Sequence, residues 1–160
     1  MTLVNHFKLS MLSSSSNEAV ARTAVAAFVS QLDPTMDELS EIKTAVSEAV
    51  TNCIIHAYRD KIGIIYIETS LFEGGRISIK IRDKGCGIAD IQRAMEPMYT
   101  TGGSERAGLG FAVMENFMDR IKVSSMPERG TTVTMVKTIS RREVRVNTGE
   151  PFKKCIQETG

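Results

Sequence analysis

The sequence predicts an α+β fold, in which helices cover one face of a mixed, largely antiparallel sheet to give a two-layer α/β sandwich. After a short alternating run at the N-terminus, two helical patterns follow one another, and two alternating strands joined through Glu73-Gly74-Gly75 come next. A third helix and a second hairpin, turning at residues 127–130, complete the pattern. Helices and strands are therefore partly segregated along the 160 residues, a length that suits one domain with one core.

The two N-terminal helices are expected on either side of Pro34. The first has Ser16 or Asn17 as its N-cap. The second begins at Thr35 and Glu38, which form the capping-box pattern T-x-x-E. Apolar residues then recur at helical spacing and predict a buried face made of Leu39, Ile42, Val46, Val50, Cys53 and Ala57.

Alternation of apolar and polar residues predicts five strands. They are expected over residues 6–12, 64–72, 76–82, 121–125 and 131–139. A short helix is expected over residues 90–96 and a longer one over 109–120. Residues 1–139 are therefore expected to form the domain, and the charged, turn-rich residues 140–160 a mobile C-terminal tail.

Composition narrows the function classes. Lys and Arg number 20 and Asp and Glu 19, so the chain as a whole offers no field that favours nucleic acid or an anionic membrane. The chain lacks a long apolar run and a signal peptide, so we expect a cytoplasmic protein. Three isolated cysteines suit a reducing compartment. Two histidines without zinc-ligand spacing make a zinc site improbable, and we interpret His56 as a packed or capping residue.

The second helix carries the pattern E-x-x-x-N at Glu48 and Asn52. Residues four apart share a helix face, and this face is turned away from the apolar stripe. A carboxylate and a carboxamide one turn apart can supply oxygen ligands to Mg²⁺, or a base beside a metal ligand. Taken alone, the pair is better explained as part of a solvated helix face.

The strand over residues 76–82 runs into Asp83, Gly85 and Gly87. A carboxylate here can accept a hydrogen bond from an exocyclic amine such as that of adenine, and the glycines allow close backbone approach to a ring. Loops with Asp and Gly are common, so this motif is weak by itself. Thr131, after Gly130, is either a plain strand residue or a hydroxyl that faces the same ligand.

A polar, glycine-rich loop enters the third helix. Because a helix N-terminus has free N–H groups and a positive dipole end, this loop is a candidate phosphate site. Arg106 can pair with a terminal phosphate. The P-loop and protein-kinase motifs do not occur in the chain.

These motifs and their order resemble the GHKL ATPases of the Bergerat fold, which include histidine-kinase catalytic domains; the resemblance covers residues 7–139. The runs LDPTMDELSEIKTAVSEAVTNCIIHAY, GLGFAVMENFMD and GTTVTM resemble the anti-sigma serine kinases of spore-forming Firmicutes. The resemblance implies ATP and Mg²⁺ as cofactors, with Glu48 as general base and Asn52 as metal ligand. It further implies contacts to the nucleotide from Asp83, Gly85, Gly87, Thr100, Thr101, Arg106, Gly108, Leu109, Gly110 and Thr131.

The resemblance also implies partners. One is the sporulation sigma factor sigma-F, held inactive by a homodimer, and the other a STAS-domain anti-anti-sigma factor phosphorylated on serine. Arg22 on the first helix is expected near the partner surface. Two alternatives stay open, namely a nucleotide-gated binding protein without phosphotransfer and an anti-sigma kinase for a stress-response sigma factor.

Overall fold

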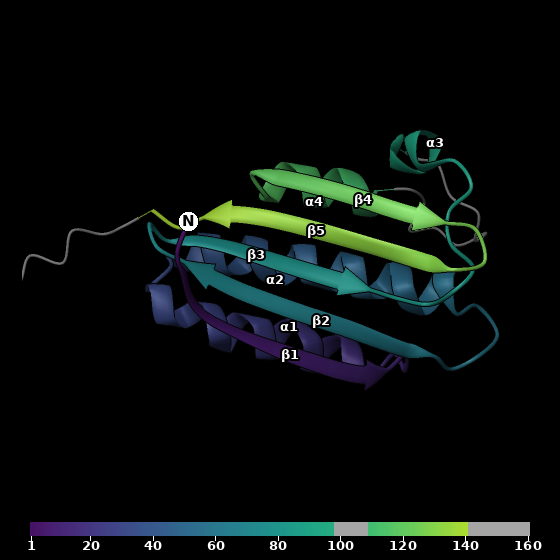
Figure 1. Cartoon of the computed structure of the whole chain (residues 1–160), viewed down its shortest axis with the longest axis horizontal. Helices are drawn as coiled ribbons and strands as arrows, with labels where there is room; N and C mark the ends of the chain where they lie inside the picture. Colours follow the sequence, from purple (N-terminus) through teal and green to yellow (C-terminus); the bar gives the residue numbers. More distant parts are fainter. Residues whose placement is uncertain (98–108, 141–160) are drawn as a thin grey trace, which may run out of the picture.

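The computed structural model describes residues 1–97 and 109–140. Five strands form a single sheet in the order β1-β2-β3-β5-β4 (Figure 1). They are β1 (Leu3–Leu12), β2 (Ile64–Phe72), β3 (Arg76–Arg82), β4 (Arg120–Met126) and β5 (Gly130–Thr138). The helices are α1 (Asn17–Val29), α2 (Met36–Asn52), α3 (Ile91–Met95) and α4 (Gly110–Phe117), with a 3₁₀ turn at Ser30–Leu32 and a π turn at Cys53–Ala57.

The predicted α+β sandwich is confirmed, but its sheet is not mixed. All four strand pairings among the described residues are antiparallel. β3 and β4 run in the same direction after the connection through α3 and α4, yet β5 lies between them and is antiparallel to both. A parallel pair is therefore absent from the described sheet, although its β3–β4 connection is of the crossover kind.

One face of the sheet is covered by helices, which lie behind the strands in Figure 1. Alternate residues of the strands point toward this layer, and β3 contributes the fully buried Ile77, Ile79 and Ile81. α2 presents Ile42, Ala45, Val46, Ala49 and Val50 to the same core. α1 packs on α2 through small residues, with Ala21 and Val25 completely buried.

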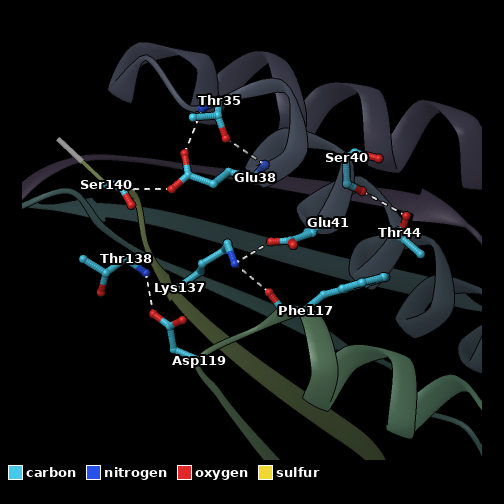
Figure 2. A network of polar contacts seen from close by, with 10 residues as sticks. All are labelled: Thr35, Glu38, Ser40, Glu41, Thr44, Phe117, Asp119, Lys137, Thr138 and Ser140. Carbon is cyan, nitrogen blue, oxygen red and sulfur yellow. Dashed lines mark hydrogen bonds and ion pairs between the residues drawn. The ribbon is translucent and has the colours of Figure 1, made fainter. Parts of the chain in front are cut away.

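The predicted capping box opens α2 as expected. Thr35 Oγ1 accepts from the Glu38 backbone N–H at 3.1 Å, and Glu38 Oε2 accepts from the Thr35 N–H at 2.8 Å (Figure 2). The second carboxylate oxygen of Glu38 accepts from the Ser140 N–H at 2.9 Å. Partial burial raises the pKa of Glu38, but these hydrogen bonds outweigh it, and the pKa lies below its ordinary value.

A buried lysine fixes the far end of α4. Lys137 on β5 donates to the Phe117 carbonyl at 2.7 Å and pairs with Glu41 Oε2 at 2.8 Å (Figure 2). Asp119, just after α4, accepts from the Thr138 N–H at 2.7 Å. A cation at the last carbonyls of a helix is favourable, so this network anchors α4 between α2 and the sheet. The helix ends at Phe117, three residues earlier than predicted.

Candidate functional site

A cavity of about 640 Å³ opens at one end of the helical layer. Its walls come from the C-terminal half of α2, the π turn, the loop after β3, the start of α4 and the β4–β5 hairpin. Six of the residues predicted to form a site line it: Glu48, Asn52, Asp83, Gly87, Gly110 and Thr131. Segments far apart in sequence are therefore brought to one enclosed space of ligand size.

Glu48 and Asn52 lie one turn apart on α2, beside the first residue of α4. A Cβ added to Gly110 would lie 3.1 Å from Glu48 Oε2 and 3.4 Å from Asn52 Oδ1. Glycine thus lets the N-terminus of α4 approach both side chains closely. Neither side chain hydrogen-bonds to another residue in the described part of the chain, so their oxygens face the cavity uncommitted.

The side-chain oxygens at this position suit a metal ion whose remaining ligands come from a bound molecule and from water. Within residues 1–97 and 109–140, His, Cys, Asp and Glu nowhere gather in a cluster of three or more. An all-protein metal cage is thus not among the described features. Mg²⁺ commonly takes only one or two protein oxygens together with phosphate oxygens and water. The Asn52 carboxamide, with Glu48 beside it, fits that pattern.

The π turn after α2 positions the loop after β3, which forms another part of the cavity wall. It widens the helix so that the Tyr58 N–H reaches back to the Cys53 carbonyl at 3.1 Å. Two carbonyls then become available to the loop after β3. The Ala57 oxygen accepts from the Cys86 N–H at 3.1 Å, and the His56 oxygen accepts from the Cys86 thiol at 3.2 Å. The sequence predicted a plain helix here, because five-residue turns leave no simple apolar signal.

Asp83 is 5% exposed and is held by three donors. Its Oδ1 accepts from the backbone N–H groups of Gly85 at 2.9 Å and Thr131 at 3.2 Å. The Cys53 thiol donates to Oδ2 at 3.6 Å. Burial raises the pKa of Asp83 and the hydrogen bonds offset this only in part. The carboxylate is thus fixed in one orientation at the cavity wall.

Gly85 and Gly87 are needed for a reason besides the predicted approach to a ligand. A Cβ on Gly85 would overlap the Ala57 carbonyl, and one on Gly87 would overlap the Met126 carbonyl. Gly87 also has φ of +71°, where side chains are strained. Both glycines therefore accommodate the protein's own backbone. Gly87 lines the cavity, whereas Gly85 lies behind Asp83 and lines a smaller neighbouring hollow.

Thr131 approaches the site through its backbone and its hydroxyl. Its N–H donates to Asp83, and its hydroxyl lies 2.7 Å from the Ser125 hydroxyl. Ser125 in turn accepts from the Ile88 N–H at 2.8 Å. The β4–β5 hairpin and the loop after β3 are therefore tied together beside Asp83, a role for Ser125 that the sequence did not reveal.

Other wall residues were not predicted as site residues: Cys53, His56, Arg59, Cys86 and Phe111. His56 was interpreted as a packed or capping residue, yet it faces the cavity; burial and nearby Arg59 lower its pKa. The available signal was its distance of four residues from Asn52, one further turn along the same helix face.

Some predicted residues are not tested by this geometry. Thr100, Thr101, Arg106 and Gly108 lie outside the described residues. Leu109 precedes α4 as its N-cap and is 48% exposed. Arg22 lies on α1, away from the cavity, with its guanidinium 3.2 Å from Glu18 Oε2. Glu18 also accepts from the Ser47 hydroxyl, so Arg22 belongs to a polar group joining α1 to α2.

The comparisons with known proteins agree with this arrangement. Residues 13–137 match the model of the histidine kinase-like ATPase domain. The chain is 55% identical over 140 residues to the anti-sigma F factor of Thermoanaerobacter sp. (strain X514), covering 87% of this chain and 97% of that protein. It is 53% identical over 145 residues to the anti-sigma F factor of Oceanobacillus iheyensis, covering 89% and 99%.

A solved structure shares the fold. It contains the RsbU and RsbW domains of Rv1364c from Mycobacterium tuberculosis, with a TM-score of 0.65, 17% identity and coverage of 87% of this chain and 34% of that one. In addition, no helix in the described part of this chain is long and apolar enough to cross a membrane. The sequence identity along nearly whole chains, together with the shared ATPase fold, shows that this chain belongs to the anti-sigma F factor family of histidine kinase-like ATPases.

Proposed function

We propose that this protein binds and inhibits the sporulation sigma factor sigma-F and, as an ATP-dependent protein serine kinase, phosphorylates a STAS-domain anti-anti-sigma factor. The observation that carries the kinase activity is the meeting of Glu48, Asn52 and Gly110 at one end of a cavity whose other wall holds Asp83. A base, a metal ligand and a helix N-terminus are the parts that phosphoryl transfer requires.

The adenine is placed against Asp83. Its exocyclic amine donates to the carboxylate, whose orientation is already fixed by Gly85 and Thr131. The phosphates then extend toward Asn52 and the start of α4, where Leu109 and Gly110 offer backbone N–H groups. Outside the described residues, we assign Thr100, Thr101, Arg106 and Gly108 to phosphate contacts, as the family resemblance implies.

Asn52 would hold Mg²⁺, which supplies charge neutralisation at the phosphates when bound. Glu48 accepts the proton of the attacking serine hydroxyl, while the bond between that oxygen and the terminal phosphorus forms and the bond to ADP breaks. The carboxylate is free for this role because it makes no hydrogen bond within the described chain. The closeness of Gly110 to Glu48 supports a position of the phosphates beside the base.

The names of the relatives support the sigma factor as partner. We place the partner surface on α1, around Arg22, which is not among the residues that line the cavity. A cytoplasmic homodimer is the form we expect to bind. The STAS substrate must also present its serine hydroxyl at Glu48, so its docking reaches the mouth of the cavity.

The test is transfer of label from γ-labelled ATP and Mg²⁺ to the serine of a STAS partner, with nucleotide binding measured in parallel. Glu48→Gln should lower the transfer rate about 10²- to 10⁴-fold and leave nucleotide affinity within a few-fold, because only the base is removed. Glu115→Gln, on an exposed position of α4, is the matched control and should keep the wild-type rate. A wild-type protein that binds ATP and sigma factor but transfers no label would contradict the kinase proposal and leave a nucleotide-gated sequestering protein.

A further inference from the structure

The sheet face opposite the helices carries a strong positive charge. The outward positions of the strands and the residue after β3 place seven cations there: Lys8, Arg76, Lys80, Arg82, Lys84, Arg120 and Lys122. We call these seven residues the basic face. The described helices lie behind the sheet in Figure 1, so the helix-free face of the sheet is turned toward the viewer and no described helix covers it.

Charge on the chain is therefore segregated. The basic face has seven of the 20 Lys and Arg residues, whereas Glu68 is the single acid at the outward positions of the five strands. At the strand positions alone, six of these cations stand against one acid, a local charge of +5, so the rest of the chain carries −4 against a total of +1. The net charge of the whole chain is close to zero because these two regions cancel. We expected no nucleic-acid partner on the basis of that net charge. A local field can be strong while the net charge is small.

The strand register aligns the charges. Lys8, Glu68, Lys80, Thr134 and Lys122 are successive cross-strand neighbours, so three lysines lie in one row across the sheet. Glu68 lies 3.4 Å from Lys8 and 3.9 Å from Lys80. Such exposed pairs contribute little, and one carboxylate shared by two lysines leaves an excess of positive charge. Arg120 and Lys122 form no ion pair with any described residue.

The other outward residues bear on which partner fits. Seven of them carry hydroxyl groups: Ser10, Ser70, Ser78, Ser124, Thr132, Thr134 and Thr138. The rest are His6 and apolar or aromatic residues, which lie mostly at the strand ends: Leu12, Ile64, Tyr66, Phe72, Met126 and Val136. Lys, Arg, Ser and Thr together are the side chains that hydrogen-bond to phosphate oxygens in nucleic-acid complexes. The core of a protein–protein interface is instead depleted in Lys and rich in aromatic residues. The composition therefore favours a phosphodiester backbone over an acidic protein.

Duplex DNA fits better than a single strand. Proteins that bind single strands stack bases on exposed aromatic rings. Two aromatic rings lie on this face. Tyr66 already has Arg82 over its ring at 5.2 Å and the Lys84 ammonium at 5.3 Å, and Phe72 is half-buried at the end of β2. The cations extend from β1 to β4, four strand spacings or about 19 Å, which spreads them over a surface rather than along a single line. We propose that the basic face binds the phosphate backbone of duplex DNA without reading its sequence.

The experiment measures fluorescence anisotropy of a short random-sequence duplex with the full chain, between about 50 and 200 mM salt. Binding is expected with Kd of about 10⁻⁴ to 10⁻⁶ M at physiological salt and a steep salt dependence. Lys80→Gln with Lys122→Gln should lower affinity by about 10-fold or more at low salt and reduce the salt slope by about 2, because each of the two lysines neutralises one phosphate. Lys43→Gln removes one exposed charge from α2, in the helical layer, and should change neither.

Four results would overturn the proposal. The first is a loss of affinity in the Lys43→Gln control as large as in the Lys80/Lys122 variant, and the second is displacement of the duplex by saturating Mg·ATP, which would place the DNA in the cavity. The third is tighter binding of a single strand, or of polyglutamate at equal charge, which would indicate another occupant. No binding of the duplex at about 50 mM salt would also overturn it. The Lys80/Lys122 variant should keep wild-type nucleotide affinity, so this test and the kinase test fail independently.

Discussion

The polar side chains at the two ends of the cavity differ in how firmly the protein holds them. At one end the Asp83 carboxylate accepts from the N–H groups of Gly85 and Thr131, and the loop around it is tied to two other segments. At the other end Glu48 and Asn52 hydrogen-bond to no described residue. The first end is fixed before any ligand arrives, whereas the second has oxygens whose partners must come from outside the described chain.

This difference matches what each end has to do in the proposed function. Recognition of a flat base benefits from a preorganised acceptor, because no ordering cost is then incurred on binding. A base and a metal ligand need free lone pairs, since a hydrogen bond inside the protein would compete with the proton or the cation. Substitutions at the open end should therefore affect chemistry and leave stability unchanged, and substitutions at the fixed end should affect both.

The largest separation between activity and stability is expected at Asn52. Asn52→Ala should lower nucleotide affinity in the presence of Mg²⁺ by about 100-fold or more, because a metal ligand is removed. The free energy of unfolding should stay within about 0.5 kcal/mol or rise, because alanine favours the helix and no described hydrogen bond is broken. Calorimetric titration with and without Mg²⁺, beside urea unfolding, measures both. An equal loss of affinity without Mg²⁺ would contradict the metal-ligand role.

At the fixed end, we expect the largest loss of stability from a substitution of Gly87. In Gly87→Ala a methyl group at φ of +71° overlaps the Met126 carbonyl, so strain and displacement of the hairpin add. We expect a loss of about 3 kcal/mol in the free energy of unfolding, together with weaker nucleotide binding. Gly74→Ala is the matched control, because its φ of +82° is equally strained but open space surrounds it. It should cost about 1 kcal/mol; equal losses in the two variants would show that the Met126 carbonyl does not constrain the loop.

Asp83→Asn should weaken nucleotide binding about 10- to 100-fold, because a charged acceptor for the adenine amine is removed. Although Asp83→Asn should weaken binding, it should not lower the free energy of unfolding. Burial raises the pKa of Asp83, so the ionised carboxylate costs folding free energy at neutral pH and the neutral amide does not. The variant should therefore be at least as stable as the wild type near neutral pH.

The pH dependence of the free energy of unfolding tests whether the ionised Asp83 carboxylate destabilises the fold. A folded pKa above the unfolded value means that the wild type gains stability as the pH falls through the folded pKa of Asp83 toward the ordinary value of 3.8. The margin in favour of Asp83→Asn should shrink over that range, as followed by urea unfolding at several pH values. A margin that grows as the pH falls would mean that the carboxylate stabilises the fold, contrary to this account.

The sequence predicted much of this molecule because local signals and tertiary structure agree. The alternation over Ile64–Phe72 and Arg76–Arg82 gave both strand boundaries, and the capping box gave the start of α2. The sheet order was less accessible, because the insertion of β5 between β3 and β4 depends on packing over a long connection.

The open end of the site was also more predictable than the fixed end. Helical periodicity within one segment predicts that Glu48 and Asn52 share a helix face, and the family resemblance then implies their roles. The surroundings of Asp83 depend instead on contacts between segments, such as Ser125 with Ile88, and on a π turn without a sequence signal. Cys53 shows the same limit: its spacing marked it as a core residue, which is correct, but its thiol also contacts Asp83.

The smallest expected effect is at this thiol. Cys53 donates to Asp83 Oδ2 at 3.6 Å, and that hydrogen bond lowers the pKa of Asp83 against the larger effect of burial. Cys53→Ala removes the donor, so the pKa of Asp83 should rise further, and the acid limb of nucleotide binding should move to higher pH. Affinity at neutral pH should fall by less than about threefold, and the free energy of unfolding by about 1 kcal/mol, because a sulfhydryl donor is weak and the side chain is small.

Cys53→Ser separates hydrogen bonding from packing at the same position. Its hydroxyl is a stronger donor of similar size, so the acid limb of nucleotide binding should return to the wild-type pH or move below it, even where some stability is lost. Both variants are compared by nucleotide titration across the acid range. If the serine variant binds like the alanine variant at every pH, then Cys53 contributes packing alone, and the fixed end of the cavity relies on the backbone donors of Gly85 and Thr131.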